Sequence, residues 1–408
     1  MNCLVVEIDA NLTNRLRNQK LQLRFLTAKD LPRASFLASH AFRRGAETNI
    51  PMERWMSPDR TRFGIEEGGE LLACFSIQDF KLMFGEELHP CGGICGVMVD
   101  PAARGRGYAR DLIHRGLEIM RDKGQYLSNL WPFNHQFYQG YGWDWTGWYQ
   151  NVTIPVHHFK SDPEAKNVRL AREDSWPLLA TIYEARASQS NGAILRNETQ
   201  WREKFGRFDG RERLIFVHES DGVPDGYAFL RYDSEPRKAT INEFVALNGQ
   251  AWRGLLGALH NMAMTVDTIT LQLGMRDEIW SHLVHWSVES KRLPNGMGRI
   301  VDLPKALEAC SSENSVSGSC VISVEDKHAP WNTGNWQINI ENGHAEVTET
   351  QVETGVTLDI CALSQAYWGS PNLDDLRLAG RLEVHREEDF AILKNLLPAN
   401  DVWLQDDF

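Results

Sequence analysis

The spacing of apolar residues changes near residue 100, and the change predicts a strand followed by a helix. Val97, Met98 and Val99 end an apolar run that stops at Pro101, a residue that cannot continue sheet pairing. From Ala109 to Met120, apolar residues recur at the i, i+3, i+4, i+7, i+8 and i+11 positions of one helix face. We therefore expect a strand, a short loop and an amphipathic helix in that order.

The loop between these elements carries two arginines and two glycines, Arg104, Gly105, Arg106 and Gly107. Glycine lets the backbone take positive φ or approach a ligand closely. A helix N-terminus adds free N–H groups and a partial positive charge, which together bind phosphate. The pattern therefore predicts a pyrophosphate-binding site at the start of the helix.

Two common phosphate-binding motifs fit this loop poorly. The P-loop needs Gly-Lys-Ser or Gly-Lys-Thr at the helix start, whereas this chain has Gly107-Tyr108-Ala109. The dinucleotide fingerprint needs a third glycine where Arg110 stands, and the next predicted strand, residues 125–131, has no acidic residue for a ribose. The loop therefore indicates another kind of phosphate site.

Two parts of the chain follow the same order of predicted elements. Segments that begin at Leu23 and Val168 each read as a strand, a turn and an amphipathic helix, with Pro32 and Pro177 at matching offsets. A hairpin with a glycine turn and a strand–helix pair then follow in both parts. We expect two copies of one α/β unit.

The second copy lacks the glycine loop. When the two patterns are aligned, Trp252 stands at the place of Arg104, and Leu255 stands at the place of Gly107. Without the glycines, the backbone loses the freedom that a close phosphate contact needs. We therefore expect phosphate binding in the first copy only.

Beyond about residue 295 the pattern changes again. A predicted strand and short helix lead into alternating strands around the Asn342-Gly343 hairpin turn, and two predicted helices follow. A chain of 408 residues is long enough for two or three domains. We therefore expect a third domain of α+β type.

Composition narrows the class of partner. Asp and Glu number 55 against 43 Lys and Arg, a net charge of −12, which argues against nucleic acid. The acidity would suit a cationic small molecule, or it merely keeps the protein soluble. No stretch approaches the roughly 18 apolar residues of a membrane span. The first twenty residues lack the pattern of a signal peptide, so we expect a cytoplasmic protein with no membrane partner.

The cysteines are scattered along the chain. Their odd number, 7, predicts free thiols rather than a disulfide framework. His89, Cys91 and Cys95 are close in sequence, but no second pair of ligands stands at the spacing of a zinc site. We therefore expect no bound metal.

The stretch Arg104-x-x-Gly107-x-Ala109, after an apolar strand, resembles the acetyl-CoA signature of the GCN5-related N-acetyltransferases (GNAT). The resemblance implies that acetyl-CoA is a co-substrate and that the loop N–H groups hold its pyrophosphate. It also implies that the backbone of the strand pairs with the pantetheine arm. The residues assigned to this binding are Val97, Met98, Val99, Arg104, Gly105, Arg106, Gly107, Tyr108, Ala109, Arg110, Phe133 and Asn134.

The stretch FYQGYGW, residues 137–143, looks like the tyrosine segment of the Eis (enhanced intracellular survival) family of this superfamily. Eis proteins have two acetyltransferase-like units, the second without the CoA motif, and a third domain similar to sterol carrier protein 2 (SCP2). The implied fold is α/β (α+β), with tandem GNAT-fold units, central mixed sheets flanked by helices, and a C-terminal SCP2-like α+β domain. The expected divisions are an N-terminal extension at 1–20, a catalytic GNAT domain at 21–160, a degenerate GNAT-like domain at 161–294 and the SCP2-like domain at 295–408.

The resemblance also implies the chemistry. The protein would be an acetyl-CoA-dependent N-acetyltransferase that modifies a primary amine of a small molecule or a lysine by direct attack in a ternary complex. Tyr138 would protonate the departing CoA thiolate, and the C-terminal carboxylate of Phe408 would act as base for the amine. Trp403 and Leu404 could anchor the tail that carries Phe408. Eis proteins assemble as oligomers, often hexamers, so we expect a homo-oligomer.

Two questions stay open at this point. Arg43 and Arg44 would repel a polycationic acceptor, whereas Glu47, Asp406 and Asp407 would attract one, so aminoglycosides, polyamines and peptide lysines all remain possible. The chain could also hold CoA, an acyl ligand or a lipid without turnover, and in the lipid case the third domain would supply an apolar tunnel.

Overall fold

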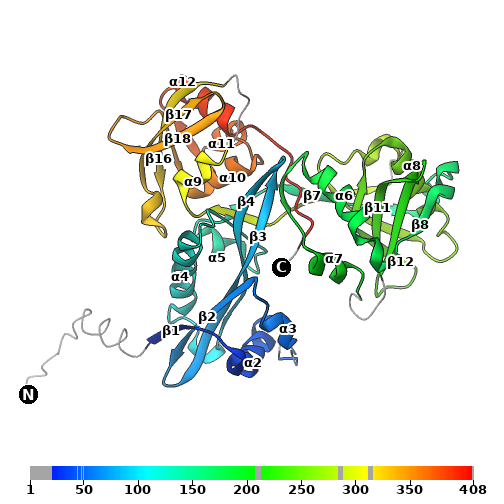
Figure 1. The fold of residues 1–408 in the computed structure, drawn as a ribbon, viewed down its shortest axis with the longest axis horizontal. Coiled ribbons are helices and arrows are strands. Elements are labelled where there is room, and N and C mark those ends of the chain that lie inside the picture. The colour runs from blue at the N-terminus through cyan, green and yellow to red at the C-terminus, as the bar shows by residue number, and fades with distance from the viewer. Residues whose placement is uncertain are drawn as a thin grey trace, which may run out of the picture.

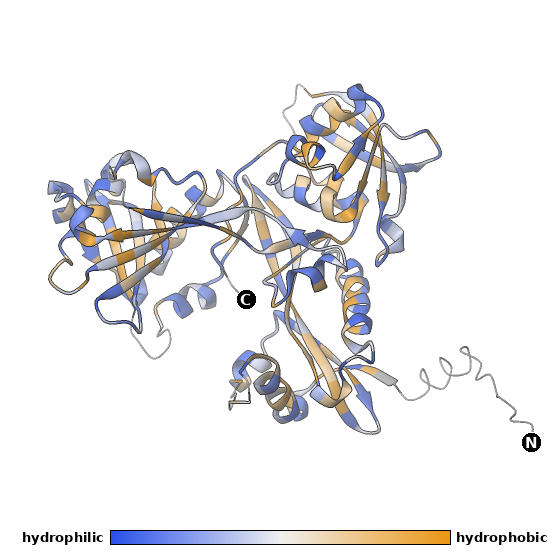
Figure 2. Cartoon of the chain, turned by 180° about the vertical axis from the view of Figure 1, so that it is seen from behind, coloured by the Kyte–Doolittle hydropathy of each residue, from blue (hydrophilic) through white to orange (hydrophobic). Residues whose placement is uncertain are grey.

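The molecule has three lobes, each built on one mixed β-sheet with helices packed against it (Figure 1). The computed structural model describes residues 21–43, 45–46, 48, 50–206, 213–283, 288–310 and 316–406. Apolar residues concentrate on the strands and on the helix faces turned toward them (Figure 2). The mixed α/β architecture expected from the sequence is confirmed.

The first lobe contains an eight-stranded sheet in the order β1-β2-β3-β4-β5-β15-β6, with β9 paired to β3. Only β4 and β5 run parallel within it. The strands are β1 (Leu21–Phe25), β2 (Arg60–Glu67), β3 (Glu70–Phe84), β4 (Glu87–Val99), β5 (Leu127–Leu130), β6 (Asp144–Trp145), β9 (Asn191–Ile194) and β15 (Met297–Ile300). The helices are α2 (Leu31–Phe42), α3 (Met52–Trp55), α4 (Tyr108–Asp122) and α5 (His135–Gln139).

The second lobe contains a seven-stranded sheet in the order β14-β7-β13-β12-β11-β10-β8. It repeats the plan of the first, because β12 and β13 form its parallel pair and α8 connects them. The strands are β7 (Trp148–Pro155), β8 (Val168–Leu170), β10 (Arg213–Ser220), β11 (Val223–Tyr232), β12 (Lys238–Ala246), β13 (Thr268–Gly274) and β14 (Glu289–Pro294). The helices are α6 (Trp176–Ala187), α7 (Glu198–Lys204) and α8 (Gly249–His260).

The third lobe contains a five-stranded sheet in the order β18-β17-β16-β19-β20. Its strands are β16 (Gly318–Glu325), β17 (Gly334–Glu341), β18 (His344–Thr350), β19 (Val356–Asp359) and β20 (Leu382–Val384). Its helices are α9 (Leu303–Glu308), α10 (Ile360–Trp368), α11 (Leu373–Leu378) and α12 (Glu387–Leu396). No helix within the described ranges is long and apolar enough to cross a membrane.

The helix predicted from the 3.6-residue period is present as α4. Its buried face includes Leu112, Ile113, Leu117 and Met120, as the pattern predicted. Gly116 lies on the same face, where an added Cβ would come 2.6 Å from the Phe75 ring. A glycine at this point therefore lets α4 pack closely on the sheet.

Strands are exchanged between the lobes. β7 lies in the chain range expected for the first unit, yet it pairs with β13 in the second sheet. In return, β9 pairs with β3, and β15 pairs with β5 and β6 in the first sheet. The expected domain divisions remain predictions, but the sheets themselves continue across residues 160 and 294. The first two lobes therefore cannot separate without breaking strand pairs.

The C-terminal segment leaves the third lobe and runs between the other two (Figure 1). It is held to β9, because Asn191 N donates to Asp401 O at 2.8 Å and Trp403 N donates to Asn191 O at 2.9 Å. Trp403 and Leu404 are buried, at 1% and 5% exposure. These two side chains anchor the tail at the junction of the lobes.

A buried histidine between the first and third lobes makes stability depend on pH. His89 is 3% exposed, and the Tyr126 and Tyr367 hydroxyls lie 3.2 and 3.0 Å from its Nδ1. Burial lowers the pKa of His89 to about 4. As pH falls below the ordinary histidine pKa of about 6.5, His89 is protonated in the unfolded chain but stays neutral in the folded protein. The folded protein should therefore lose stability between about pH 6.5 and 4.

The expected loss from His89 is about 3 kcal/mol over this window, since each pKa unit corresponds to about 1.4 kcal/mol. His89→Gln keeps an amide near the two hydroxyls but does not titrate. Chemical denaturation at pH 7 and pH 4 should therefore show a smaller acid loss for the variant than for the wild type. Equal acid losses for the two proteins would contradict this role of His89.

Candidate active site

The parallel strands β4 and β5 separate partway along their length. They pair only at Cys91 with Leu127, Gly92 with Ser128, and Gly93 with Asn129. β4 continues for six more residues, whereas β5 ends at Leu130. Val97, Met98 and Val99 therefore lie past the last pair with β5, on a strand whose other edge is held by β3. The edge of β4 that faces away from β3 is therefore unpaired over these residues, and its backbone can pair with an extended ligand in the cleft between β4 and β5.

The loop that follows β4 is shaped by an aspartate and two glycines. Asp100 Oδ1 accepts from Ala102 N at 2.7 Å, and Arg33 Nη2 donates to Asp100 Oδ2 at 2.5 Å. Gly105 and Gly107 have φ of +79° and +90°, which side chains with a Cβ rarely adopt. Gly107 is the N-cap of α4 and offers no side-chain cap, so the N–H groups of the first turn face outward.

Most of the predicted loop residues lie together at the start of α4. Arg104, Gly105, Arg106 and Arg110 are exposed, and Gly107 and Ala109 are partly buried. Arg106 Nη1 lies 3.7 Å from Glu67 Oε2, and Arg110 Nη2 lies 3.0 Å from Asp111 Oδ1. The loop and the first turn of α4 therefore bring glycine backbone and three exposed arginines together at the start of the helix.

Tyr108 differs from its neighbours in the loop. Its side chain is 4% exposed and packs in the core of the first lobe. Its hydroxyl donates to Glu67 Oε2 at 3.1 Å, so it is engaged away from the surface. Only the backbone N–H of Tyr108 is placed to meet a ligand at the helix start.

Tyr138 lies on α5, the short helix after β5. It is 4% exposed, with the Phe137 and Phe133 rings 5.0 and 5.5 Å from its ring centroid. Burial raises the pKa of Tyr138 well above its usual range, and the nearby Cys95 on β4 adds to this effect. Cys95 belongs to the part of β4 that no longer pairs with β5. Tyr138, with its hydroxyl protonated, packs in the same apolar core as Val97 and Val99 of this part of β4.

Phe133 and Asn134 stand at the entrance to α5. Phe133 is 65% exposed, and its ring covers Tyr138. Asn134 is the N-cap of α5, where its Oδ1 accepts from Phe137 N at 3.1 Å. This cap occupies the side-chain oxygen, which leaves the amide NH2 group of Asn134 as the donor toward a ligand.

A cavity of about 750 Å³ lies between the first two lobes. None of the residues predicted for acetyl-CoA binding lines it. Its wall includes Trp131, directly after β5, and Leu404 to Asp406 of the tail. Trp131 Nε1 donates to Asp406 O at 2.8 Å. The tail is thereby fastened beside the end of β5, and the predicted base Phe408 lies outside the described residues.

A buried ionic network holds the tail from the other side. Arg196 is fully buried and donates from both terminal nitrogens to Glu243, at 2.8 and 2.7 Å. Its Nε donates to Asp406 Oδ2 at 2.9 Å, and Lys204 Nζ lies 3.0 Å from Asp406 Oδ1. Burial by itself would raise the pKa of Asp406, but Arg196 and Lys204 outweigh it and lower this pKa to about 2.

This network changes one expectation and adds residues that the sequence did not indicate. Asp406 was expected to attract a polycationic acceptor, but its carboxylate is already paired with Arg196 and Lys204. Asp407 and two residues of the loop after α2, Arg44 and Glu47, lie outside the described residues. Asp406 therefore holds the tail in place.

The second lobe has no equivalent of the glycine loop. Trp252 and Leu255 lie inside α8 rather than before it. The helix starts after Asn248, whose Oδ1 accepts from Gln250 N and Ala251 N, both at 2.9 Å. A side-chain cap thus occupies N–H groups at the start of α8, whereas the corresponding groups of α4 lack one. The structure therefore offers one candidate phosphate site of this kind among the described residues.

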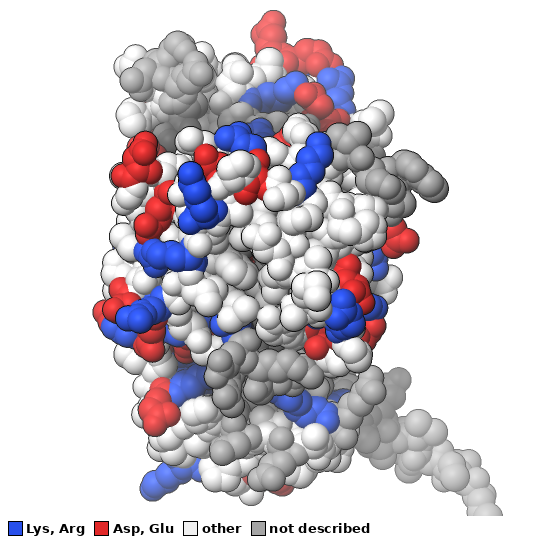
Figure 3. Space-filling view, turned by 90° about the vertical axis from the view of Figure 1, so that its right-hand side faces the viewer, with Lys and Arg blue, Asp and Glu red and all other residues white. Residues whose placement is uncertain are grey.

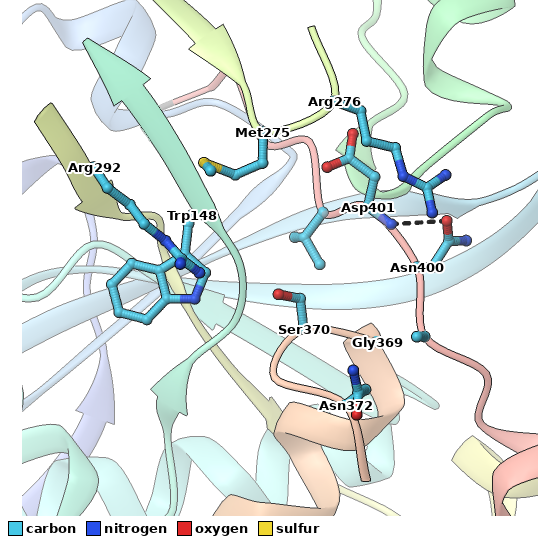
Figure 4. A pocket seen from close by; sticks show the side chains of 11 residues that line it. Trp148, Met275, Arg276, Arg292, Gly369, Ser370, Asn372, Asn400 and Asp401 are labelled. Atoms are coloured by element: carbon cyan, nitrogen blue, oxygen red, sulfur yellow. Dashed lines mark hydrogen bonds between the residues drawn. The ribbon is translucent and has the colours of Figure 1, made fainter. Parts of the chain in front are cut away.

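A smaller cavity of about 230 Å³ lies where the third lobe meets the second (Figure 4). Arg276, Arg292, Ser370 and Asp401 are among its lining residues. Asp401 is engaged by Arg186 Nη2 at 3.1 Å. Among the described residues, none that is predicted for acetyl-CoA binding or catalysis lines this cavity. In the part of the chain that the structure describes, no cluster of three or more metal-ligating side chains is found.

Comparison with protein families assigns the three lobes. Residues 22–146 and residues 192–300 each match a family described as acetyltransferase (GNAT) domain, and residues 303–405 match the sterol carrier protein domain. N-acetyltransferase Eis of Mycobacterium tuberculosis is 27% identical over 358 residues, which cover 82% of this chain and 84% of that protein. The chain is an N-acetyltransferase with two GNAT domains and a sterol carrier protein domain, and it is similar to Eis over most of its length.

Other relatives agree with this assignment. An uncharacterized N-acetyltransferase of Streptomyces avermitilis is 26% identical over 374 residues, covering 84% of this chain and 88% of that protein. A probable N-acyltransferase of Enterococcus faecalis shares the fold with a TM-score of 0.84 at 21% identity, covering 95% and 99% of the two chains. Eis1 of Mycobacterium abscessus has a TM-score of 0.78 at 22% identity, covering 95% and 100%. The two solved structures therefore share the fold of nearly the whole chain.

Proposed function

We propose that the enzyme transfers acetyl from acetyl-CoA to a primary amine of a small molecule or lysine, by direct attack in a ternary complex. The observation that carries the proposal is the separation of β4 from β5 beside the glycine loop at the start of α4. An open strand edge and a phosphate-binding helix start suit an extended pantetheine and a pyrophosphate, respectively. Acetyl-CoA supplies the activated acetyl group when it is bound.

The residues that would hold acetyl-CoA come from the strand, the loop and α5. The backbone of Val97, Met98 and Val99 would pair with the pantetheine and polarise the thioester carbonyl. The loop N–H groups would hold the pyrophosphate, together with the guanidinium groups around them. The loop residues in this role are Arg104, Gly105, Arg106, Gly107, Tyr108, Ala109 and Arg110, and Phe133 and Asn134 would add contacts from α5.

Tyr138 would donate its proton to the departing CoA thiolate. The ordinary pKa of tyrosine is about 10, so the transfer to a thiolate is reasonable. Burial raises the pKa of Tyr138 further, which keeps the proton on the hydroxyl over the working pH range but makes it a weaker acid. The same apolar surroundings would raise the pKa of the thiol, since burial disfavours a thiolate as it does a phenolate. The role of Tyr138 as general acid thus agrees with its protonation state and its place beside the cleft.

The C-terminal carboxylate of Phe408 would hold the ammonium of the acceptor and take its proton as the C–N bond forms. Support comes from the position of Asp406, whose carbonyl accepts from Trp131 at the end of β5. Two further residues extend at most about 7 Å, which keeps a terminal carboxylate near this point. A carboxylate with a pKa of about 3.5 is a weak base, so holding the amine close would be its main contribution.

The proposal predicts one acetyl-CoA per chain, bound through the first lobe. Gly107→Trp should abolish binding, because a side chain at φ +90° strains the backbone and fills the pyrophosphate site. The matched control is Gly249→Trp at the exposed start of α8, where an added Cβ meets only Arg253 Nη1 at 3.6 Å. Titration calorimetry should give unchanged binding for the control. Two sites per chain, or normal affinity in Gly107→Trp, would refute the single-site assignment.

Extra residues after Phe408 should cut acetyl transfer at least tenfold, because they move the carboxylate away from the amine. Acetyl-CoA affinity should stay the same, since none of the residues proposed to bind it belongs to the tail. A tag of equal length before Met1 serves as the control and should be harmless. Equal turnover by the two tagged proteins would rule out a catalytic C-terminus.

We also propose a cytoplasmic homo-oligomer, with the hexamer as the assembly that the Eis resemblance implies. All described cysteines are free thiols, which is usual in a reducing compartment. Support for the oligomer is the resemblance alone, and light scattering at the monomer mass of 46.5 kDa would refute it.

A further inference from the structure

The cavity between the first two lobes has a predominantly basic lining. Its lining residues include five basic side chains, from Arg54, Arg60, Lys204, Arg213 and Arg231, against two acidic ones, Glu203 and Asp406. Asp406 is already paired with Arg196 and Lys204, so the charges of Lys204 and Asp406 offset each other, and four arginines remain against Glu203. The rest of the wall is rich in neutral amides, from Gln78, Gln200, Asn242, Gln272, Asn295 and Gln405.

Arg60 connects this cavity to the reaction centre. Its Nη2 donates to Gln78 Oε1 at 2.6 Å, and its Nη1 lies 3.7 Å from Cys95 Sγ. Cys95 belongs to the part of β4 beyond its last pair with β5, and Tyr138 packs with the neighbouring residues Ile94 and Val97 in the core of the first lobe. Gln78 and Cys95 are both uncharged, and arginine stays protonated at any working pH. The Arg60 guanidinium thus places a positive charge near the strand residues that pack with Tyr138, the proposed acid.

Two more arginines gather behind Arg60. Arg62 is 9% exposed, and its Nη2 donates to the backbone carbonyl of Arg54 at 2.5 Å. Burial lowers the pKa of Arg62 to about 10, and the positive charge of Arg60 adds to this effect. Arg54 lowers the same pKa from the cavity side. This edge of the first lobe therefore holds excess positive charge.

The basic lining contrasts with the molecule as a whole. The net charge is −12, and on the face shown in Figure 3 Lys and Arg lie interspersed with Asp and Glu. Charges on the surface are screened over about 8–10 Å in physiological salt. The arginines in the cavity wall therefore decide which acceptor is favoured there, more than the net charge does.

We propose that the acceptor is a molecule that carries both a primary amine and an anionic group, either a carboxylate or a phosphate. Arg60 binds the anionic group, and the amine points toward Tyr138 and the tail. The proposal rests on the proposed function, and it names the substrate class of that site. Guanidinium groups match both anions through paired, charge-assisted hydrogen bonds. A polycation would instead meet the arginines with like charge.

Matched amines that differ in one group test the acceptor class. Glucosamine 6-phosphate is compared with glucosamine, lysine with lysinamide, and kanamycin and spermidine represent polycations. Thiol release should give at least a tenfold higher kcat/KM for one anionic member than for its uncharged or amidated partner, and than for either polycation. The two pairs separate phosphate recognition from carboxylate recognition.

Two variants assign the preference to the arginines. Arg60→Gln should reduce the anionic advantage about tenfold or more, mainly through KM, as expected when a charged hydrogen bond is lost. Arg54→Gln, at an exposed position where folding is not at risk, should reduce it less. The control Arg169→Gln removes an exposed arginine that pairs with Glu219 on the second lobe. It should change nothing.

Binding without turnover separates this inference from the proposed function. Calorimetry with glucose 6-phosphate and glucose, which carry no amine, should show binding of the phosphate only, and Arg60→Gln should weaken it about tenfold or more. If that result holds while no amine is acetylated, the anion site stands and the proposed function fails. If kanamycin or spermidine is the best acceptor, or if glucose 6-phosphate binds no better than glucose, the anionic acceptor class is overturned.

Discussion

Tyr138→Phe is expected to lower kcat by about 10²–10⁴-fold, with the Kd of acetyl-CoA nearly unchanged. The substitution keeps the ring that packs against Phe133, Phe137 and Trp143. It removes only the hydroxyl that would protonate the CoA thiolate. Because burial holds the pKa of Tyr138 well above its usual range, the wild type should also lose no activity near pH 10 from ionisation of this group.

Tyr141→Phe is the matched control for this prediction. Tyr141 lies three residues further on, packs against Phe137, and is also a tyrosine with a raised pKa because of burial. It has no assigned chemical role, so its variant should keep kcat within about threefold. If Tyr138→Phe reacts at full speed, Tyr138 is a core aromatic and another group must protonate the thiolate.

Arg196→Met is expected to lower the free energy of unfolding by about 3 kcal/mol, at the lower end of the cost of breaking a buried ion pair. The variant leaves Glu243 and Asp406 in the interior without their main counter-charge. Lys204 remains within 3.0 Å of Asp406 and 3.5 Å of Glu243, which limits the loss. Turnover should also fall, because Asp406 positions the tail.

An exposed arginine gives the control for Arg196. Arg202 pairs with Glu198 and Glu173 at the surface of α7, and Arg202→Met should lower the free energy of unfolding far less than Arg196→Met, because exposed ion pairs are screened by water. Arg196 acts through the tail, so its variant should keep the affinity for acetyl-CoA while kcat falls. A loss of stability below that of Arg202→Met, or unchanged kcat, would contradict the role of the buried network.

Local patterns were sufficient for the part of the site that is continuous in sequence. The apolar run to Val99, the two glycines and the 3.6-residue period of α4 all lie within about thirty residues, so their spacing predicts their geometry. The start of α8 was misplaced by the repeat alignment, which put Trp252 and Leu255 before the helix. The signal for the true start was present, since Asn248 is a favoured N-cap residue.

Contacts between distant segments could not be predicted in this way. β7, β9 and β15 read as ordinary strands, and nothing in their alternation indicates that they pair in another lobe. Arg196 ends an apolar run and would ordinarily be taken as exposed. Its carboxylate partners are 47 and 210 residues away, so only the folded chain brings them together.

The basic cavity likewise arises from tertiary structure. Arg54 and Arg60 come from the first lobe, whereas Arg213 and Arg231 come from the second. The net charge of −12 sums all charged residues and says nothing about where they lie, so an acidic chain can still carry a basic cavity. The sequence left the acceptor class open for this reason.

The central claim is that the cleft of the first lobe transfers acetyl from acetyl-CoA to an amine. The direct measurement is mass spectrometry of purified protein incubated with acetyl-CoA and a panel of anionic, neutral and cationic primary amines and a lysine peptide, with free CoA thiol counted in parallel. We expect at least one acetylated amine, formed in equal amount to free CoA and almost absent with Tyr138→Phe. Binding of acetyl-CoA with no acetylated amine and no thiol release above the rate without protein would contradict the claim.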